Sequence, residues 1–316
     1  MKRVIFAFIL MIVSISLKSQ FDAQFSQYWA CKNYYNAASV GSDKSGNATL
    51  FNRQQWLGMP GAPKSLFIGL DMPITIFGKS QGVGINMFSD NIGLFKNSSV
   101  MLNYAYKMHF WGGKISLGAQ IGIINQSFDG TKVNIKEFTD PAHAASDEYI
   151  PTTSVQAMAY DMGVGVYFSN EKFYAGLSVA HLMQPTLDFD EKSSTYVGRL
   201  VYFTSGFAMP IEESAIVLYP STLIKSDFRV YQFDFTLRGE YNEKFWAGIS
   251  YRWNNAIIAM VGVRMKNISF GYSYDVSTSK LFTVTSGSHE LFATYSFDFA
   301  LPVKNKTKIN KSVRYL

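Results

Sequence analysis

Histidine and cysteine are the side chains best suited to metal binding and nucleophilic catalysis. This 316-residue sequence has four histidines and one cysteine. The histidines are His109, His143, His181 and His289. None of them is spaced from another as zinc ligands usually are. Cys31 is alone, so it forms no disulfide within the chain, and we expect it to be buried. The sequence therefore predicts neither a metal site nor a cofactor site.

A serine–histidine pair could hydrolyse lipids if both side chains came within hydrogen-bond distance. His289 lies between Ser288 and Glu290 in the sequence. Successive side chains of a strand point to opposite faces, so His289 would face away from both neighbours. The acids within residues 140–148 lack the oxygen spacing of an EF-hand loop and are expected to be solvated. We therefore expect no enzymatic activity.

Polar residues recur at every second position in many segments, between apolar ones, and residues 229–241 are the clearest case. One face carries Tyr231, Phe233, Phe235 and Leu237, and the other carries Gln232, Asp234, Thr236, Arg238 and Glu240. Facing lipid, such a row of polar groups would be very costly, whereas a hydrated lumen accommodates it. Lipid cannot hydrogen-bond an open sheet edge, so the strands must close on themselves. The pattern predicts a transmembrane antiparallel β-barrel.

The same alternation assigns a set of charged side chains to the interior of the barrel. The set is Asp161, Asp234, Arg238, Glu240, Arg252, Arg264, Asp275, Glu290 and Asp298. Acids and bases are mixed in it, so we expect them to pair across the barrel wall and partly fill the lumen. The alternative is a polar channel or a docking site for a peptide.

The alternating segments number about 14, which is an all-β fold with the even strand count typical of single-chain bacterial barrels. They cover residues 47–57, 63–73, 80–88, 96–108, 113–127, 157–169, 172–182, 194–209, 213–225, 227–241, 243–253, 256–266, 268–277 and 287–299. If the first strand rises from the periplasm, the short turns fall on the periplasmic side and the three longest connections on the other. The loop lengths therefore place long loops at the cell surface and both mature termini in the periplasm.

Composition and the two chain ends favour an exported membrane protein. Charged residues make up 16% of the chain, against about 25% in soluble domains. Residues 1–20 combine positive charges with a short apolar run, which is typical of a signal peptide. Residues 21–46 do not alternate and are expected to form a plug in the lumen or to lie against the rim, and residues 47–299 to form the barrel. The basic tail at 300–316 is expected to be solvated or to contact an acidic partner, rather than nucleic acid.

Several short motifs occur in order along the mature chain. They are Phe25-Ser26-Gln27-Tyr28, Arg53-Gln54-Gln55-Trp56, Gly61-Ala62-Pro63-Lys64, Ser89-Asp90-Asn91-Ile92-Gly93, Phe173-Tyr174-Ala175-Gly176-Leu177-Ser178 and Phe245-Trp246-Ala247-Gly248-Ile249-Ser250-Tyr251-Arg252. Taken together, they resemble the PorP/SprF family of the type IX secretion system, over residues 21–299. One departure is Ala37, which stands where the family usually has proline.

The resemblance implies a non-catalytic outer-membrane protein of Bacteroidota that belongs to an export and adhesion apparatus. Such a protein binds the secretion and gliding machinery, or serves export and surface anchoring of a secreted adhesin. Its partners would be outer-membrane lipid and either the C-terminal domain of that adhesin or periplasmic components of the system. The motif residues that would contact a partner or order the structure around them are Gln27, Tyr28, Arg53, Trp56, Pro63 and Lys64.

A different function remains open on the residues alone. A barrel of about 14 strands can enclose a channel or a ligand cavity. The alternative is therefore a passive porin or a transporter of hydrophobic ligands in the outer membrane. Conductance or ligand uptake by the purified protein would favour this alternative, and a closed barrel would count against it.

Overall fold

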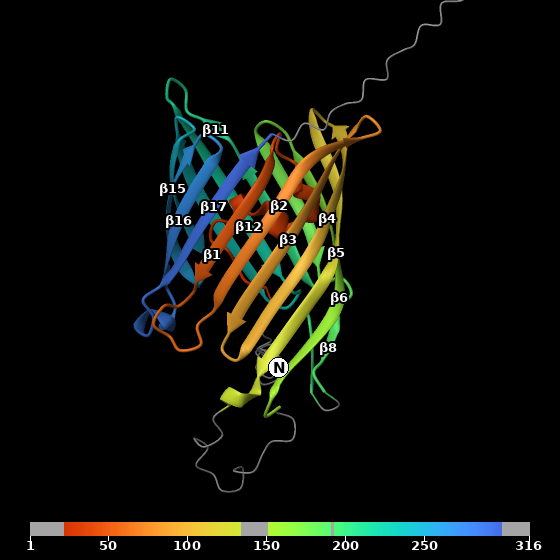
Figure 1. Ribbon diagram of the computed structural model, residues 1–316. Coiled ribbons are helices and arrows are strands. Elements are labelled where there is room, and N and C mark those ends of the chain that lie inside the picture. The colour runs from red at the N-terminus through yellow and green to blue at the C-terminus, as the bar shows by residue number, and fades with distance from the viewer. Residues whose placement is uncertain (1–21, 134–150, 191–192, 299–316) are drawn as a thin grey trace, which may run out of the picture.

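The computed structural model describes residues 22–133, 151–190 and 193–298, and these residues fold into a closed barrel (Figure 1). The wall of the barrel consists of 14 antiparallel strands. Its first strand, β1 (Gly46–Gln54), pairs with its last, β17 (Ser288–Phe297), and this pairing closes the sheet. The predicted fold class, an all-β transmembrane barrel of about 14 strands, is confirmed.

The other strands of the wall follow one another around the barrel in chain order. They are β2 (Lys64–Ile76), β3 (Lys79–Ile92), β4 (Phe95–Phe110), β5 (Gly113–Asp129), β6 (Ser154–Ser169), β7 (Phe173–Ala180), β10 (Leu200–Phe207), β12 (Ile216–Ser226), β13 (Tyr231–Tyr241), β14 (Phe245–Arg252), β15 (Ala256–Met265) and β16 (Ile268–Ser277). Each segment expected from the alternation overlaps one strand of the wall.

One expected strand is shorter than its alternating pattern. Residues 194–209 were expected to form a single strand, but only Leu200–Phe207 joins the wall as β10. The preceding residues form β9 (Ser194–Tyr196), which pairs with β8 (Thr186–Asp188) in a separate two-stranded sheet. Leu187 and Val197 are fully buried against apolar lumen residues of β4, β5 and β6. Burial of these two side chains inside the barrel therefore accounts for the early break in the wall strand.

The remaining short elements lie in connections at the two rims. They are η3 (Gly130–Lys132), β11 (Met209–Pro210), which pairs with β12, and η5 (Lys280–Thr283). None of the helices in the described ranges is long and apolar enough to cross a membrane.

The outer face of the wall is apolar along its strands. Leu102, Ile121 and Leu291 each expose more than half of their surface, and every second residue of their strands points the same way. In water such a belt would be unstable, but in a bilayer it faces hydrocarbon. The alternation seen in the sequence therefore separates a lipid face from a lumen face.

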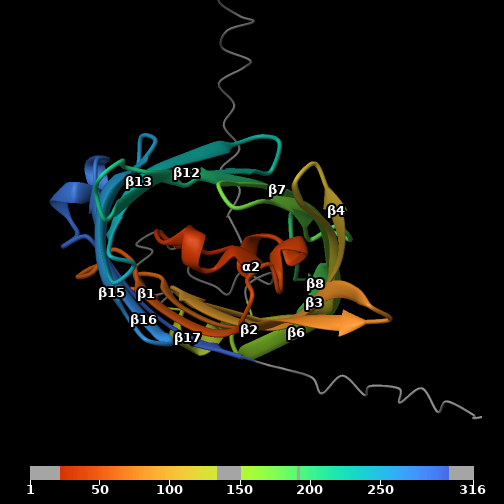
Figure 2. The same ribbon diagram turned by 90° about the horizontal axis from the view of Figure 1, so that it is seen from above.

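The chain before β1 lies inside the barrel, where Figure 2 shows it crossing the lumen. We call residues 22–45 the lumen segment. It contains three short helical elements, η1 (Tyr28–Ala30), α2 (Lys32–Tyr35) and η2 (Ala37–Ser39). Phe25, Tyr28 and Tyr35 are buried within it and belong to the main apolar core, which aromatic residues of the wall complete.

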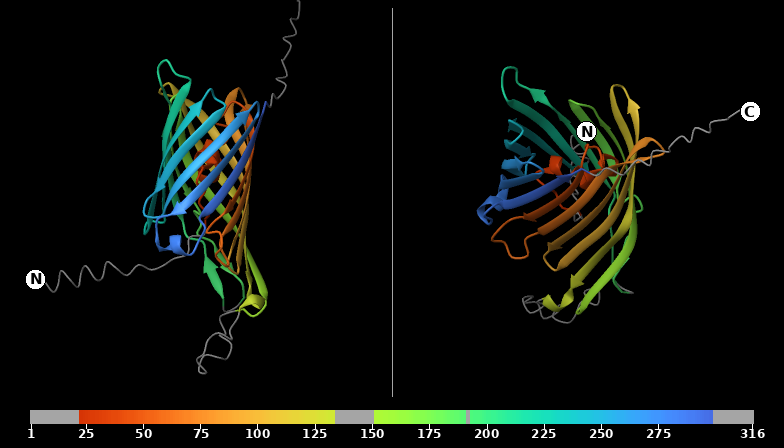
Figure 3. Two further views of the ribbon diagram at one scale, coloured as in Figure 1. Left: turned by 90° about the vertical axis from the view of Figure 1, so that its left-hand side faces the viewer. Right: turned by 45° about the horizontal axis from the view of Figure 1, so that its top comes forward.

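The lumen segment runs from one rim of the barrel towards the other. The short turns, such as 77–78 and 111–112, lie at one rim, and the longer connections lie at the opposite rim, where β5 and β6 extend farthest (Figures 1 and 3). The amine of Lys225 donates a hydrogen bond to the backbone carbonyl of Asp22. Lys225 lies at the end of β12 nearest the long connections. Gly41 bonds to Asp71 towards the short-turn end of β2.

The expectation that both mature termini lie in the periplasm stays a prediction, because both ends of the chain lie outside the described residues. The described chain begins at Asp22, towards the long connections, and ends at Asp298, next to the short-turn end of β17. Alternation predicts strands, but it says nothing about the path of a segment that does not alternate. Which rim faces the periplasm stays a prediction from loop length.

Candidate functional site

A buried ion network joins the lumen segment to the barrel wall. Its centre is Arg53 on β1, whose side chain is 1% exposed. Its guanidinium bonds to Asp275 on β16 at 2.7 Å and to Glu290 on β17 at 3.2 Å. It also donates to the hydroxyl of Ser26 in the lumen segment at 2.7 Å. The arginine therefore holds three separate parts of the chain together in the lumen.

A second arginine extends the same network along the wall. Arg252 on β14 contacts Asp234 on β13 at 3.0 Å and Asp275 at 3.2 Å. Asp234 in turn accepts a hydrogen bond from the side-chain amide of Gln24 at 2.9 Å. Two arginines, Arg53 and Arg252, thus contact three acids: Asp234, Asp275 and Glu290. From the alternation, charged side chains of the lumen were expected to pair with one another in this way. The pairing also includes the lumen segment, which the alternation gave no reason to expect.

The carboxylate of Glu290 fixes the backbone of the lumen segment. One of its oxygens accepts the backbone N–H of Ser26 at 2.7 Å, and the other accepts that of Gln27 at 2.9 Å. A carboxylate that accepts two backbone N–H groups in a dry interior forms strong charge-assisted bonds. The Phe25-Ser26-Gln27-Tyr28 motif is therefore a part of the segment whose backbone is bound directly by a carboxylate of the wall.

A second charged group lies nearer the short turns. The guanidinium of Arg238 bonds to Glu240 at 2.7 Å, and Glu240 also receives Arg264 at 3.0 Å. Arg238 lies between two aromatic faces, 4.1 Å from the ring centre of Trp29 and 4.3 Å from that of Tyr219. These are cation–π distances. The arginine thereby attaches η1 to β12 and β13.

A third buried group was predicted only in part, because the set of lumen charges included Asp161 but neither His181 nor Asp22. His181 lies just after β7, and its ring nitrogens contact Asp161 at 2.6 Å and Asp22 at 3.0 Å. Asp22 also accepts a hydrogen bond from the hydroxyl of Tyr202. The alternation extended this strand to residue 182 and so put His181 on the same face as Val179, but β7 ends at Ala180 and His181 has a φ of 52°. The proximity of Asp22 depends on the path of the lumen segment, which no sequence pattern reveals.

The charges of this third group shift the pKa values of its members. Burial alone lowers the pKa of His181, but the negative charge of Asp22 and the bonds to both carboxylates raise it to about 10. Burial alone raises the pKa of Asp22, but the charge and hydrogen bond of His181 lower it to about 2. Imidazolium and carboxylate therefore stabilise each other inside the lumen.

These shifts predict a pH dependence of stability. The histidine contribution is fully present below its ordinary pKa of 6.5 and is lost as the pH rises through about 10. The Asp22 contribution is present above 3.8 and is lost as the pH falls through about 2. We expect the free energy of unfolding to fall on the alkaline side, by on the order of a few kcal/mol at pH 10, and the unfolding temperature to fall with it. Thermal unfolding followed by tryptophan fluorescence measures this change.

The matched variant for this prediction is His181→Gln. It keeps a hydrogen-bonding side chain but cannot carry the charge, so the difference in stability between wild type and variant should shrink as the pH rises from 6.5 to 10. A difference that is constant over this range would contradict the assignment of the charge to His181.

The other motif residues have different positions. Gln27 and Tyr28 are buried in the lumen, and the hydroxyl of Tyr28 bonds to Ser221 on β12. Trp56 and Pro63 lie in the β1–β2 connection at the rim with the longer connections, and Lys64 is the first residue of β2. The backbone N–H of Trp56 donates to the hydroxyl of Ser288 at 3.1 Å. Pro63 is buried and Lys64 is exposed.

Asp298 and His289 lie outside the buried network. Asp298 is exposed and accepts a hydrogen bond from Ser45 at 3.1 Å, at the rim with the short turns. The ring of His289 bonds to the hydroxyl of Tyr272 at 2.7 Å, while Ser288 turns to the other face of β17. Among the described residues, no group of three or more His, Cys, Asp or Glu side chains is placed to hold a metal ion.

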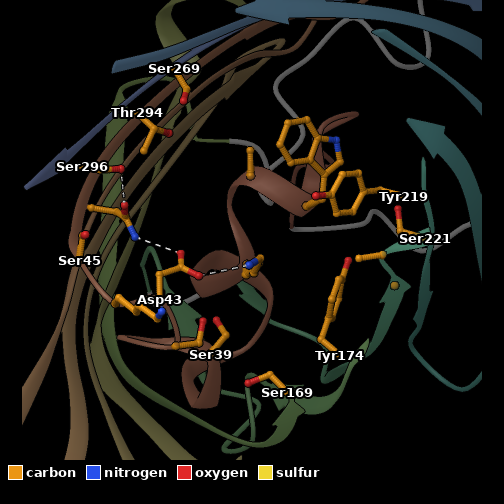
Figure 4. Close-up of a pocket in the computed structure, with 18 of the residues that line it drawn as sticks. Ser39, Asp43, Ser45, Ser169, Tyr174, Tyr219, Ser221, Ser269, Thr294 and Ser296 are labelled. Carbon is orange, nitrogen blue, oxygen red and sulfur yellow. Dashed lines mark hydrogen bonds and ion pairs between the residues drawn. The ribbon is translucent and has the colours of Figure 1, made fainter. Parts of the chain in front are cut away.

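The lumen is open at the short-turn rim. A cavity of about 750 Å³, which we call the vestibule, lies there, with the lumen segment as part of its lining (Figure 4). Hydroxyl side chains of β16 and β17, namely Ser269, Thr294 and Ser296, line one side. Tyr174 and Tyr219 line the opposite side. The vestibule therefore offers hydrogen-bonding groups and aromatic faces together.

A closed barrel with an apolar outer belt and a charged, occupied lumen defines an outer-membrane β-barrel protein. The family model of the type IX secretion system membrane protein PorP/SprF matches residues 17–295. The chain belongs to this family, which confirms the resemblance seen in the motifs. No curated protein matches the sequence.

Solved structures with a similar fold are barrels. The toluene transporter TbuX of Ralstonia pickettii has a TM-score of 0.51 and 13% identity, over 86% of this chain and 94% of that chain. Omp33, an outer-membrane protein of Acinetobacter baumannii, has a TM-score of 0.47 and 6% identity, over 81% and 100% of the two chains. The toluene transporter TodX of Pseudomonas putida has a TM-score of 0.46 and 8% identity, over 88% and 95%. At such identities the likeness of TbuX shows the fold alone.

Proposed function

We propose that this protein is a non-catalytic component of the type IX secretion system that binds other proteins at the outer membrane. It either contacts the secretion and gliding machinery or serves the export and surface anchoring of a secreted adhesin through that adhesin's C-terminal domain. The observation that carries the proposal is the occupied lumen. Its own chain fills the interior, and the wall holds that chain with buried ion pairs.

The geometry supports binding rather than passage. A channel needs a continuous polar path, but Arg53 and Glu290 are almost completely buried against the lumen segment. The folded-in β8–β9 hairpin fills a further part of the lumen next to β4, β5 and β6. The vestibule is open, and its mixed lining of hydroxyl and aromatic groups suits a polypeptide segment from a partner at that rim.

Deletion of the gene tests the proposal in the cell. We expect one class of surface adhesin, or gliding motility, to be lost while other secretion substrates still reach the surface. Whole-cell proteolysis and surface proteomics measure this, with a plasmid copy of the gene as the control. Unchanged display of every type IX substrate together with normal motility would contradict the proposal.

Purification in mild detergent identifies the partner. A large adhesin as the main companion, found by mass spectrometry, would support a role in export or anchoring. Periplasmic components of the secretion system would support attachment to the machinery. The barrel alone, after crosslinking in intact cells, would count against both.

A second candidate is a passive porin or a transporter of hydrophobic ligands. The observation in its favour is the general barrel fold, which it shares with TbuX. This candidate predicts steady conductance in a planar bilayer or uptake of an apolar ligand into vesicles. We expect the wild-type protein to be closed in both assays, because the lumen segment blocks the path.

A further inference from the structure

One edge of β6 has no strand beside it beyond the end of β7. β6 spans 16 residues, but β7 pairs only with residues 164–169. One further bond reaches that edge, from the backbone N–H of Leu182 to the carbonyl of Met162 at 2.9 Å. On its other edge β6 pairs with β5 along its whole length. Residues 154–161, at the rim with the long connections, are thus paired on one side alone (Figure 1). We call their open side the free edge.

The bonds on either side of β6 show which residues direct their backbone groups to the free edge. The carbonyl of Met162 points towards β7, whereas the carbonyl of Thr153 points towards β5, because it accepts the N–H of Gly130 at 3.1 Å. The backbone groups of a strand alternate between its two edges from one residue to the next. The residues that direct their N–H and C=O groups to the free edge are therefore Ser154, Gln156, Met158 and Tyr160.

The free edge lacks the features that usually prevent an exposed strand from pairing. Among the residues that the structure describes, none bonds to these backbone groups. Natural edges are commonly blocked by charged side chains, by proline or by a bulge. Residues 152–160 contain neither a charged residue nor a proline. The register of β6 with β5 is also continuous, so no bulge turns the edge away. The free edge is therefore able to accept another strand.

Apolar side chains flank the free edge on both faces of the wall. On the outer face, Met158 is 63% exposed and Tyr160 is 72% exposed. On the inner face, Ala157 and Ala159 belong to the same apolar cluster as Leu187 of β8. The β8–β9 hairpin forms a sheet of its own and has no ladder with β6. It covers the inner side chains of β6 without pairing with its backbone, and an added strand would have apolar neighbours on both sides.

A second copy of this chain does not fit the free edge. Two barrels in one membrane have the same orientation, so a two-fold axis between them lies along the membrane normal. Such an axis brings the two free edges together in the same direction and at the same height. N–H groups then face N–H groups and carbonyls face carbonyls, whereas a ladder needs each donor opposite an acceptor. The occupant that matches the edge is a strand of a different polypeptide.

We propose that the free edge of β6 binds an extended segment of the exported partner by strand addition. Backbone hydrogen bonds hold the segment, and Met158 and Tyr160 contact its outward side chains. The inference rests on the proposed function, and it adds the site and the form in which the partner is bound. Loop length predicts that the long connections, and with them this edge, lie at the cell surface, where an exported protein emerges. Binding through the backbone selects an extended, largely apolar segment rather than one particular sequence.

Proline at the free edge tests the backbone bonds. The Gln156→Pro, Met158→Pro double variant loses two N–H groups that point to the edge, while the bonds from the neighbouring residues to β5 remain. The matched control is Gln156→Ala, Met158→Ala, which loses the same side chains but keeps both N–H groups. The full chain is purified from outer membranes in mild detergent, and the adhesin that accompanies it is quantified by mass spectrometry. We expect about tenfold less adhesin with the proline variant than with the alanine variant, because two backbone hydrogen bonds are lost. Equal amounts with both variants, each folded as judged by heat modifiability, would overturn the proposal.

Photocrosslinking in intact cells tests the occupant without disturbing the backbone. Benzoylphenylalanine replaces Tyr160, and the same replacement of Tyr251 is the control, because Tyr251 is also exposed but its strand, β14, is paired on both edges. We expect a covalent product with the exported adhesin from position 160 and none from position 251. A product of two barrels, a product with a periplasmic component, or no product from position 160 would overturn the proposal.

Deletion of the gene separates this inference from the proposed function. Loss of adhesin display or motility on deletion, without a crosslink from position 160, would refute the free edge as the binding site and leave the proposed function standing. Normal display of every substrate and normal motility after deletion would refute the proposed function, and the assignment of the strand to an exported partner with it.

Discussion

Replacing Arg53 with methionine is expected to lower the free energy of unfolding by about 3–5 kcal/mol, the usual cost of removing one partner from a buried ion pair. The variant leaves Asp275 and Glu290 charged, almost fully buried and without their closest cation. Methionine keeps most of the volume, so the loss measures charge rather than packing. Denaturant unfolding of the protein in lipid vesicles, followed by tryptophan fluorescence, gives the value.

Arg264→Met is the matched control for this experiment. Its side chain is 44% exposed, and its partner Glu240 keeps the bond from Arg238. An exposed pair of this kind contributes at most about 1 kcal/mol. Equal losses for Arg53→Met and Arg264→Met would show that the network around Arg53 does not hold the lumen segment in place.

Alanine at Gly82 and Gly118 is expected to drive the lumen segment out of its groove. A Cβ added at Gly82 would overlap the backbone carbonyl of Val40, and one added at Gly118 would overlap the backbone of Ala38. Backbone atoms cannot move aside as a flexible side chain can, so the segment must shift. Overpacking of this kind costs about 1–3 kcal/mol at each site. The double variant should conduct ions in a planar bilayer, whereas the wild type should not.

Gly198→Ala is the control, because a Cβ added at Gly198 meets nothing within 4 Å. This variant should remain closed and as stable as the wild type. A double variant at Gly82 and Gly118 that stays closed, although it is folded, would mean that the lumen is blocked by something other than this segment. The β8–β9 hairpin would then be the next element to remove.

The strands could be predicted because their physics is local. A lipid face and a lumen face alternate with period two, so the sequence alone assigns Phe235 to the lipid face and Asp234 to the lumen face. The same rule could have placed Arg53, since it shares the lumen face of β1 with Phe51. The resemblance instead groups Arg53 with Trp56, Pro63 and Lys64 as residues that contact a partner or order the structure around them.

The partners within the lumen could not be predicted in the same way. Alternation identified Asp275, Glu290 and Arg252 as inward-facing, but not which of them meet, because that depends on how strands far apart in the chain close into a ring. The bond from Ser26 to Glu290 joins residues that are 264 positions apart. Asp22 precedes the first alternating segment, and His181 follows the end of β7 although the alternation continued to residue 182, so the sequence pattern did not bring the two together.

Assembly of the barrel is constrained by the position of Glu290. Arg53 and Glu290 are direct neighbours across the pairing of the first and last strands, and Glu290 also holds the N–H groups of Ser26 and Gln27. A chain whose first residues are enclosed by its last strand cannot thread them through a ring that has already shut. The lumen segment must therefore already lie on the inner face of the sheet when the last strands of the wall form. Contacts between residues so far apart in the sequence make folding slow. The pairing of β1 with β17 and the binding of the lumen segment to Glu290 then form in one cooperative step.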